Sequence, residues 1–236
     1  MDSDDEIADN CIELLMERVE AVPSVEIVQG RALGNHSTKA KKSNVFSNDE
    51  VRKVFFQSQS FPGTAWNKLI RRSFLIDNSI WFLEGVIFED TPWMFCLLKY
   101  LSRVCFVHDI TYYYSKRADS IVSSADKKER ANSFRIIYHY ILTNLTSGHE
   151  KEEFNYYAIR FAYVYTKYLR FAKELKDDYL QWKEKARIYG SPIVRMRLAA
   201  SLRLERLKYG WVPFVAWERM KTPLLIPSDI KRFLMR

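Results

Sequence analysis

The sequence predicts an α/β domain over residues 1–125 followed by an α-helical extension over residues 126–236. Up to about Ser124, short apolar segments rich in β-branched residues alternate with segments of helical spacing, which is typical of α/β proteins. Beyond that point, apolar residues recur three and four positions apart over long stretches, which indicates helices. With 236 residues, of which 47% are hydrophobic, the chain is long enough to bury a sizeable core.

The first quarter of the chain predicts a helix, a strand and a second helix. Residues 7–20 place apolar side chains at helical spacing ahead of Pro23, so we expect a helix there. The stretch VEIVQG, residues 25–30, is short, β-branched and closed by a glycine, as in a buried strand. Residues 31–47 are polar and predict a loop, and residues 49–57 predict a helix that ends near a Phe-Pro-Gly turn.

The rest of the α/β part predicts two helices and more extended chain. Residues 66–76, WNKLIRRSFLI, predict a short helix, and residues 79–82, SIWF, predict an extended segment. Residues 90–103 predict a helix with a proline in its first turn, where a missing backbone N–H costs least. Residues 105–115, CFVHDITYYYS, predict a pair of strands. The helices expected in the extension span residues 127–145, about 151–175, 178–188 and 192–208.

Cysteine usage and the N-terminus predict a cytoplasmic protein. The three cysteines show no C-x-x-C spacing, so neither a disulfide framework nor a zinc site is expected. The N-terminus is acidic where a signal peptide would be basic, and no apolar run approaches the roughly 18 to 20 residues that cross a bilayer.

The net charge of +8 is concentrated near the C-terminus. From residue 181 onward, 13 Lys and Arg oppose 4 acidic residues, a net charge of +9, which leaves −1 for the preceding chain. Helix 192–208 mixes arginines with apolar residues and precedes Trp211 and Trp217, a composition that suits peripheral contact with an anionic membrane. A packed helical subdomain whose arginines face water explains the same pattern, and both interpretations stay open. No nucleic-acid-binding signature occurs, so nucleic acid is not an expected partner.

Two acidic clusters are the candidates for chemistry. Asp2, Asp4 and Asp5 form a D-x-D-D pattern whose carboxylates can converge on one hard cation such as Mg²⁺ or Mn²⁺. Glu89 and Asp90 lead into a predicted helix, where an aspartate aimed into a cleft can take a proton from a sugar hydroxyl as a general base. Acidic residues at such positions also cap helices, and capping stays open for both clusters.

Four segments follow one another in a recognisable order: DSDD (2–5), GTAWNKLIRRSFL (63–75), LEGVIFEDTPW (83–93) and YYYSKRADSIVSS (112–124). This order, with W-N-K-L and Y-Y-Y…S-I as its more distinctive members, resembles bacterial family 2 glycosyltransferases of the GT-A fold. The resemblance covers residues 1–125 and implies part of a Rossmann-like GT-A domain. It also implies a nucleotide-sugar donor and a glycan or lipid-linked acceptor, as in capsule or O-antigen synthesis.

The resemblance assigns the chemical roles to the acidic clusters. Asp2, Asp4 and Asp5 would hold a divalent metal, Mg²⁺ or Mn²⁺, against the diphosphate of the donor. Asp90 of the Glu89, Asp90 pair would be the catalytic base, which implies in-line displacement with inversion at the sugar carbon.

The resemblance also assigns substrate contacts. Trp66, Asn67 and Lys68 match a family segment near the acceptor, although Trp66 as a core anchor and Lys68 in solvent are open alternatives. Arg117 stands where many relatives carry a histidine, and its guanidinium suits phosphate oxygens, with assistance from Ser120.

In that family, the acidic motif follows a first half that grips the nucleotide base, whereas the sequence given begins at the motif. We therefore expect a glycosyltransferase that lacks its N-terminal nucleotide-binding half. The alternative is a non-catalytic remnant that acts as an acceptor-binding or interaction module.

Overall fold

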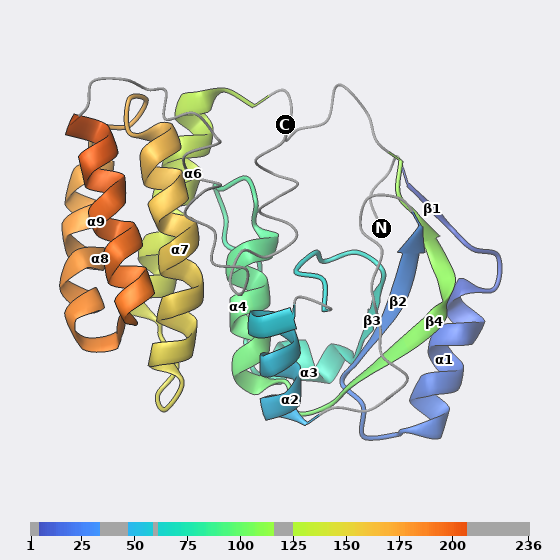
Figure 1. Cartoon of the computed structure of the whole chain (residues 1–236). Coiled ribbons are helices and arrows are strands. Elements are labelled where there is room, and N and C mark those ends of the chain that lie inside the picture. Colours follow the sequence, from blue (N-terminus) through green and yellow to red (C-terminus); the bar gives the residue numbers. More distant parts are fainter. Residues whose placement is uncertain (1–4, 34–46, 59–60, 116–124, 207–236) are drawn as a thin grey trace. The chain divides into compact units, whose positions relative to one another are not determined.

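The computed structural model describes residues 5–33, 47–58, 61–115 and 125–206 (Figure 1). The chain forms two compact units. The sheet unit comprises residues 1–83 and 90–123, and the helical unit comprises residues 84–89 and 124–236. The expected fold class, α/β followed by helices, is confirmed.

The sheet unit contains a mixed four-stranded sheet in the order β1-β4-β2-β3. Its strands are β1 (Glu6–Ile7), β2 (Ile27–Leu33), β3 (Lys68–Ile70) and β4 (Val104–Tyr113). β2 and β4 are parallel, whereas β1 and β3 are antiparallel to their neighbours. A parallel pair needs a long crossover, and helices between β2 and β4 in the sequence supply it.

β2 confirms the predicted strand and continues three residues past Gly30. The predicted strand pair at residues 105–115 is wrong, because β4 is one continuous strand. It pairs with β2 on one side and with β1 on the other, and its first four side chains are all buried, so both of its faces are covered. The register between β2 and β4 shifts on both sides of Arg31, which marks a bulge in the pair.

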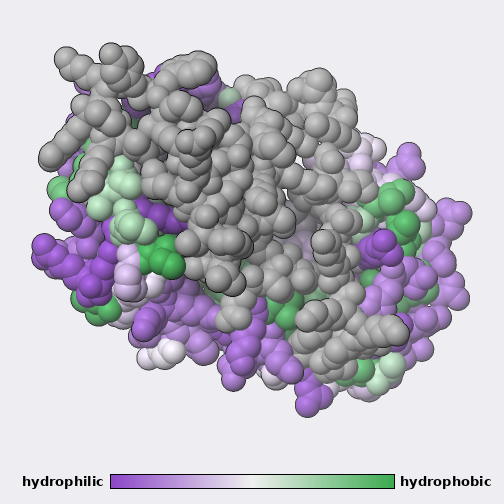
Figure 2. All heavy atoms as spheres, in the orientation of Figure 1, coloured by the Kyte–Doolittle hydropathy of each residue, from purple (hydrophilic) through white to green (hydrophobic). Residues whose placement is uncertain are grey.

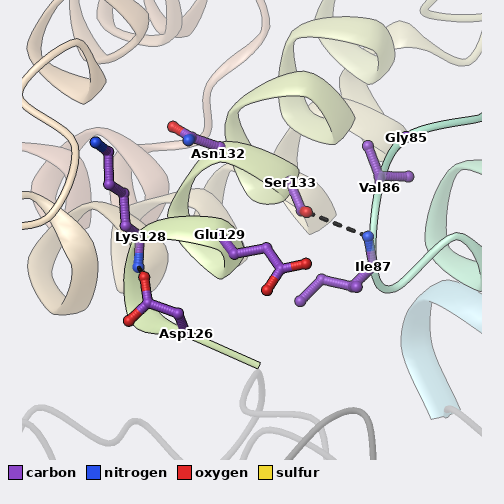
Figure 3. A pocket seen from close by; sticks show the side chains of 8 residues that line it. All are labelled: Gly85, Val86, Ile87, Asp126, Lys128, Glu129, Asn132 and Ser133. Carbon is purple, nitrogen blue, oxygen red and sulfur yellow. Dashed lines mark hydrogen bonds between the residues drawn. The ribbon is translucent and has the colours of Figure 1, made fainter. Parts of the chain in front are cut away.

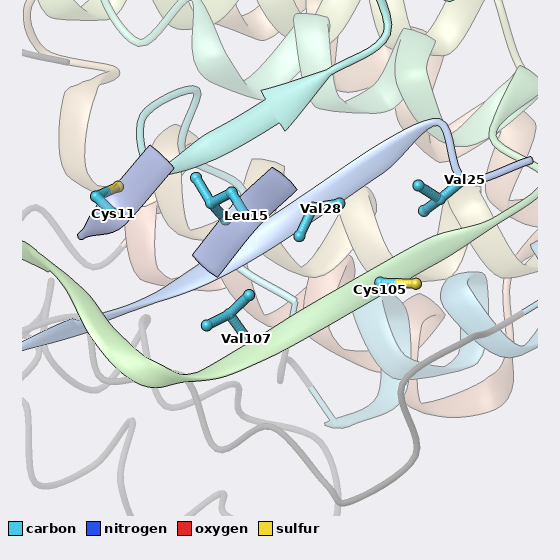
Figure 4. Close-up of a cluster of buried hydrophobic side chains, with 6 residues drawn as sticks. All are labelled: Cys11, Leu15, Val25, Val28, Cys105 and Val107. Carbon is cyan, nitrogen blue, oxygen red and sulfur yellow. The ribbon is translucent and has the colours of Figure 1, made fainter. Parts of the chain in front are cut away.

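Helix α1 (Cys11–Ala21) covers one face of this sheet (Figure 1). Cys11 and Leu15 point toward the sheet and pack in a buried cluster (Figure 4). The strand side of the cluster consists of Val25, Val28, Cys105 and Val107. The helix begins later than predicted, because Ile7 pairs with Tyr112 as part of β1 instead of entering the helix.

Three short helices lie on the other side of the sheet (Figure 1). They are α2 (Asn48–Lys53), which continues as the π-helical turn η1 (Val54–Ser58), α3 (Arg72–Asp77) and α4 (Asp90–Tyr100). Asn48 donates hydrogen bonds to the carbonyls of Leu98 and Leu101, and Arg52 donates to that of Leu98, which satisfies carbonyls at the end of α4.

The predicted helix over residues 66–76 is only half right. Residues 68–70 form β3, which pairs with Ile27, Val28 and Gln29 of β2, and the helical part begins at Arg72. The partner of this strand lies about forty residues earlier in the chain, so local periodicity could not identify it. Residues 79–82 form no strand.

The helical unit contains α6 (Lys127–Thr143), α7 (Glu150–Tyr168), α8 (Leu175–Tyr189) and α9 (Pro192–Arg206). These four helices confirm the predicted ones, although α7 ends at Tyr168 instead of near residue 175, which already belongs to α8. Trp182 of α8 is almost fully buried and stacks on Phe154 and Phe161 of α7, with Tyr138 of α6 at its edge. Aromatic packing therefore forms the core of this unit.

The described surface in Figure 2 mixes hydrophilic areas with small apolar ones. The most exposed large apolar side chains include Trp81, Ile188 and Met196. Within the described part of the chain, every helix is too short or too polar to span a membrane.

Candidate functional site

Residues 61–68 form a loop that carries the W-N-K sequence, and the side chain of its last residue, Lys68, binds back to earlier residues of the loop. The Lys68 ammonium donates to the carbonyl oxygen of Pro62 over 3.1 Å and to that of Thr64, and it lies 5.3 Å from the centre of the Phe61 ring. Desolvation lowers the pKa of Lys68 to about 7, while the nearby Asp90 carboxylate acts in the opposite direction. The ammonium is therefore engaged inside the loop.

Asp90 is the first residue of α4, and its carboxylate contacts this loop. The Ala65 N–H donates a hydrogen bond of 2.9 Å to Asp90 Oδ1. The positive end of the α4 dipole lies at the same place and favours the ionised carboxylate. Glu89, the other member of the predicted pair, is exposed and precedes the helix.

Asp5 is held on the other side of the same loop. Its carboxylate accepts hydrogen bonds from the Tyr112 hydroxyl, over 2.7 Å, and from the Ser115 N–H, over 2.8 Å. The Tyr112 ring stacks on buried Trp66, with 4.6 Å between ring centroids, and Tyr114 stacks on Trp66 as well. Asp5 therefore does not cap α1, which begins six residues later with Asn10 at its N-cap.

A continuous set of contacts thus joins the two candidate carboxylates. It runs from Asp5 through Tyr112 and Trp66 to Ala65, the neighbour of Trp66 in the chain, and on to Asp90. All five residues belong to the sheet unit. We call this set, together with Lys68, the loop frame.

Asn67 fixes the loop frame to the sheet. Its backbone has φ of 58°, a left-handed conformation that asparagine tolerates, and its carbonyl accepts from the Gly30 N–H and from the Gln29 amide. Its side-chain oxygen accepts a 2.8 Å hydrogen bond from the Thr111 hydroxyl. Gly30 leaves room for this pair, since a Cβ there would lie 2.0 Å from Thr111 Oγ1.

Sequence reasoning missed the residues that support the candidate carboxylates. Gln29, Ala65, Thr111 and Ser115 were not singled out, Gly30 was expected only to close a strand, and Tyr112 was named only as part of the Y-Y-Y segment. A glycine inside a strand pattern was the one available signal, because it often marks a close approach by another part of the chain. Two of the key donors are backbone N–H groups, which leave no trace in the residue type.

Four of the predicted site residues lie outside the described residues: Asp2, Asp4, Arg117 and Ser120. Their assignments remain predictions. Among those described, Asp5, Trp66, Lys68 and Asp90 belong to the loop frame and Asn67 fixes it to the sheet, whereas Glu89 belongs to the helical unit. Trp66 and Asn67 are both buried, so the core-anchor alternative describes the position of Trp66.

The described residues contain no group of three potential metal ligands, so a cation site would need Asp2 or Asp4 in addition to Asp5. Asp5 fits such a role, because two donors fix its carboxylate while lone pairs remain on both oxygens. Hydrogen bonds of this kind commonly orient carboxylate ligands of metals.

The helical unit has a pocket of its own, about 610 Å³ in volume (Figure 3). Residues 85–87 form one wall, and the first turns of α6 form the other, where Asp126 caps the helix through the Lys128 N–H. The Ser133 hydroxyl joins the walls by accepting from the Ile87 N–H over 3.1 Å. The lining combines polar side chains with the apolar Val86 and Ile87, and Ile87 precedes Asp90 by three residues in the chain.

The arginines of α9 bear on the membrane interpretation. Arg195 donates to the carbonyls of Ala186 and Arg187 at the end of α8, and Arg197 is buried. Arg197 is therefore part of the packing of the helical unit, whereas Arg195 is exposed and also hydrogen-bonds α8.

Solved structures of S. aureus TarS residues 1–349 share this fold. The structure in complex with UDP-GlcNAc has a TM-score of 0.58 and 16% identity, over 97% of this chain and 69% of that chain. The structure in complex with UDP has a TM-score of 0.56 and 14% identity, over 97% and 68% of the respective chains. The chain therefore has the fold of the TarS structures. No family model matches the sequence, and no curated protein does.

Proposed function

We propose that this protein is an inverting glycosyltransferase that uses a nucleotide-sugar donor. The observation that carries the proposal is the loop frame, whose contacts link a helix-start aspartate and a second, buried aspartate through one loop. The fold shared with TarS, whose structures contain UDP-GlcNAc or UDP, supports this class of donor.

Asp90 acts as the general base in the proposed reaction. An acceptor hydroxyl gives its proton to the Asp90 carboxylate while its oxygen forms a bond to the anomeric carbon of the donor sugar. The bond from that carbon to the diphosphate oxygen breaks on the opposite face, and the nucleoside diphosphate leaves. A single displacement of this kind inverts the configuration of the sugar carbon and needs no covalent enzyme intermediate.

Asp5, with Asp2 and Asp4, would hold Mg²⁺ or Mn²⁺. When bound, such a cation neutralises charge on the leaving diphosphate. The contribution of the protein is the orientation of Asp5 by the Tyr112 hydroxyl and the Ser115 N–H. The acceptor in this proposal is a glycan or a lipid-linked sugar, reached at the cytoplasmic face of a membrane.

The experiment measures release of UDP from UDP-GlcNAc, with other nucleotide sugars in parallel, in the presence of Mg²⁺ or Mn²⁺. Release with water as the acceptor makes the assay independent of the unknown acceptor. We expect Asp90→Asn to lower the rate by about 10²- to 10⁴-fold, the usual contribution of a general base. Asp77→Asn is the matched control, because Asp77 is an exposed aspartate of the same unit at the end of α3.

Two results would contradict the proposal. One is an Asp90→Asn variant as active as Asp77→Asn. The other is a folded wild-type protein that neither binds nor turns over any of the nucleotide sugars, which would favour the interaction module instead.

A further inference from the structure

Lys68 lies between the loop and Asp90 and acts on both. Its ammonium binds two carbonyls of the loop, those of Pro62 and Thr64, which flank the turn before Ala65. The amide of Ala65 is the group that donates to Asp90 Oδ1. A lysine that fixes the residues on both sides of Gly63 thereby fixes the direction of the Ala65 N–H.

The charge of Lys68 also acts on Asp90 directly. Desolvation is the larger influence on the pKa of Lys68 and lowers it, while attraction to the Asp90 carboxylate raises it. Asp90 starts α4, whose dipole has the same effect, while the adjacent Glu89 is exposed and therefore screened by water. A general base must be ionised to accept a proton, and both the Lys68 ammonium and the α4 dipole favour the ionised form of the Asp90 carboxylate.

We propose that Lys68 is a positioning residue for Asp90: it holds the Ala65 N–H on the carboxylate and supplies a charge that keeps the carboxylate ionised. This role differs from both the contact near the acceptor and the position in solvent that the sequence left open for Lys68. It rests on the proposed function only in so far as Asp90 is the base. The contacts themselves are properties of the folded protein and can be tested without any substrate.

The test follows the Ala65 amide by NMR during a pH titration of the ¹⁵N-labelled protein. An amide proton that is hydrogen-bonded to a carboxylate changes its chemical shift when that carboxylate is protonated, so it reports the pKa of Asp90. In Lys68→Met, which keeps the length of the side chain and removes the charge, we expect the midpoint to rise by about one pH unit. In Lys68→Arg, which keeps the charge, the midpoint should stay nearer to that of the wild type.

A reciprocal measurement guards against a Lys68→Met protein that fails to fold. The Lys68 side chain is followed by NMR of its Cε in the wild type and in Asp90→Asn. Because coupling between two titrating groups is mutual, removal of the Asp90 charge should lower the midpoint of Lys68. An unchanged Lys68 midpoint in folded Asp90→Asn would overturn the proposal, as would an Ala65 amide that does not titrate in the wild type.

Kinetics separate this proposal from the proposed function. If the wild type transfers sugar, Lys68→Met should lower kcat more than it raises KM and should move the acidic limb of the pH–rate profile upward by the shift seen at Ala65. If both NMR titrations respond but no nucleotide sugar is turned over, the proposed function fails while the Lys68–Asp90 coupling stands. If sugar is transferred and the acidic limb is the same in Lys68→Met, the positioning role is refuted alone.

Discussion

Replacement of Gly30 by alanine tests the attachment of the loop frame to the sheet. A Cβ at this position would lie 2.0 Å from Thr111 Oγ1 and 2.5 Å from Asn67 Oδ1. Both distances are well below van der Waals contact, and the two atoms are themselves joined by a hydrogen bond of 2.8 Å. Alanine is therefore accommodated only if this buried pair separates or the strand moves.

The cost has two parts. Forcing one extra carbon into a well-packed interior typically costs about 1 to 3 kcal/mol. Separation of Thr111 from Asn67 loses a hydrogen bond worth about 1 kcal/mol. The expected loss of unfolding free energy is therefore about 2 to 4 kcal/mol. With a urea dependence of about 2 kcal/mol per M, the midpoint of unfolding falls by about 1 to 2 M.

The assay is urea unfolding of the full chain, followed by circular dichroism and tryptophan fluorescence. Gly63→Ala is the matched control in the same unit, because a Cβ there would meet only the Phe55 ring at 3.7 and 3.9 Å, an ordinary contact distance. We expect Gly63→Ala to stay within about 1 kcal/mol of the wild type. If Gly30→Ala were no less stable than Gly63→Ala, the reasoning from the close approach would be wrong.

Other parts of the structure give four further predictions. Tyr112→Phe removes a donor from buried Asp5 and should lower the unfolding free energy by about 1 to 3 kcal/mol, measured by urea unfolding. Trp182→Ala should cost about 3 to 5 kcal/mol by the same assay, because its ring fills the core of the helical unit. Lys68 has a pKa of about 7 in the folded chain, so between pH 7 and 10.5 the unfolded chain binds more protons at this residue. The free energy of unfolding should therefore rise with pH in this range. The rise from pH 7 to pH 9, measured by thermal unfolding, should be smaller in Lys68→Met. Arg195→Ala should lower the melting temperature by a few degrees, measured by thermal unfolding, because this arginine donates to two carbonyls at the end of α8.

Periodicity alone predicted the four long helices of the helical unit, because each buries an apolar stripe that recurs every three or four residues. It failed where pairing across the sheet decided the structure. Lys68 is a strand residue because Gln29 is opposite to it, and Ile7 leaves the predicted helix because Tyr112 pairs with it. These partners lie far away in the sequence, and no local pattern encodes them.

The same distinction holds for the candidate site. Asp90 and Asp5 were singled out from the sequence, since carboxylates reveal their chemistry by residue type. Their supports were not, because Ala65 and Ser115 contribute backbone amides and Tyr112 reaches Asp5 across 107 residues of chain. Lys68 was expected near the acceptor or in solvent, whereas in the fold its ammonium binds carbonyls of the loop that carries it.

The bulge beside Gly30 explains why one loop can hold both carboxylates. The register between β2 and β4 shifts between Gln29 and Ala32, and within this irregular stretch the Gly30 N–H donates to Asn67. That bond, with those from Gln29 and Thr111, holds Asn67 in its left-handed conformation at the start of β3. Trp66 is thereby turned onto Tyr112, and Ala65, one residue earlier, faces Asp90. The side chain of Trp66 and the N–H of Ala65 point in different directions from neighbouring positions of the chain. Fixing the backbone at Asn67 therefore places Trp66 against the partner of Asp5 and the Ala65 N–H against Asp90.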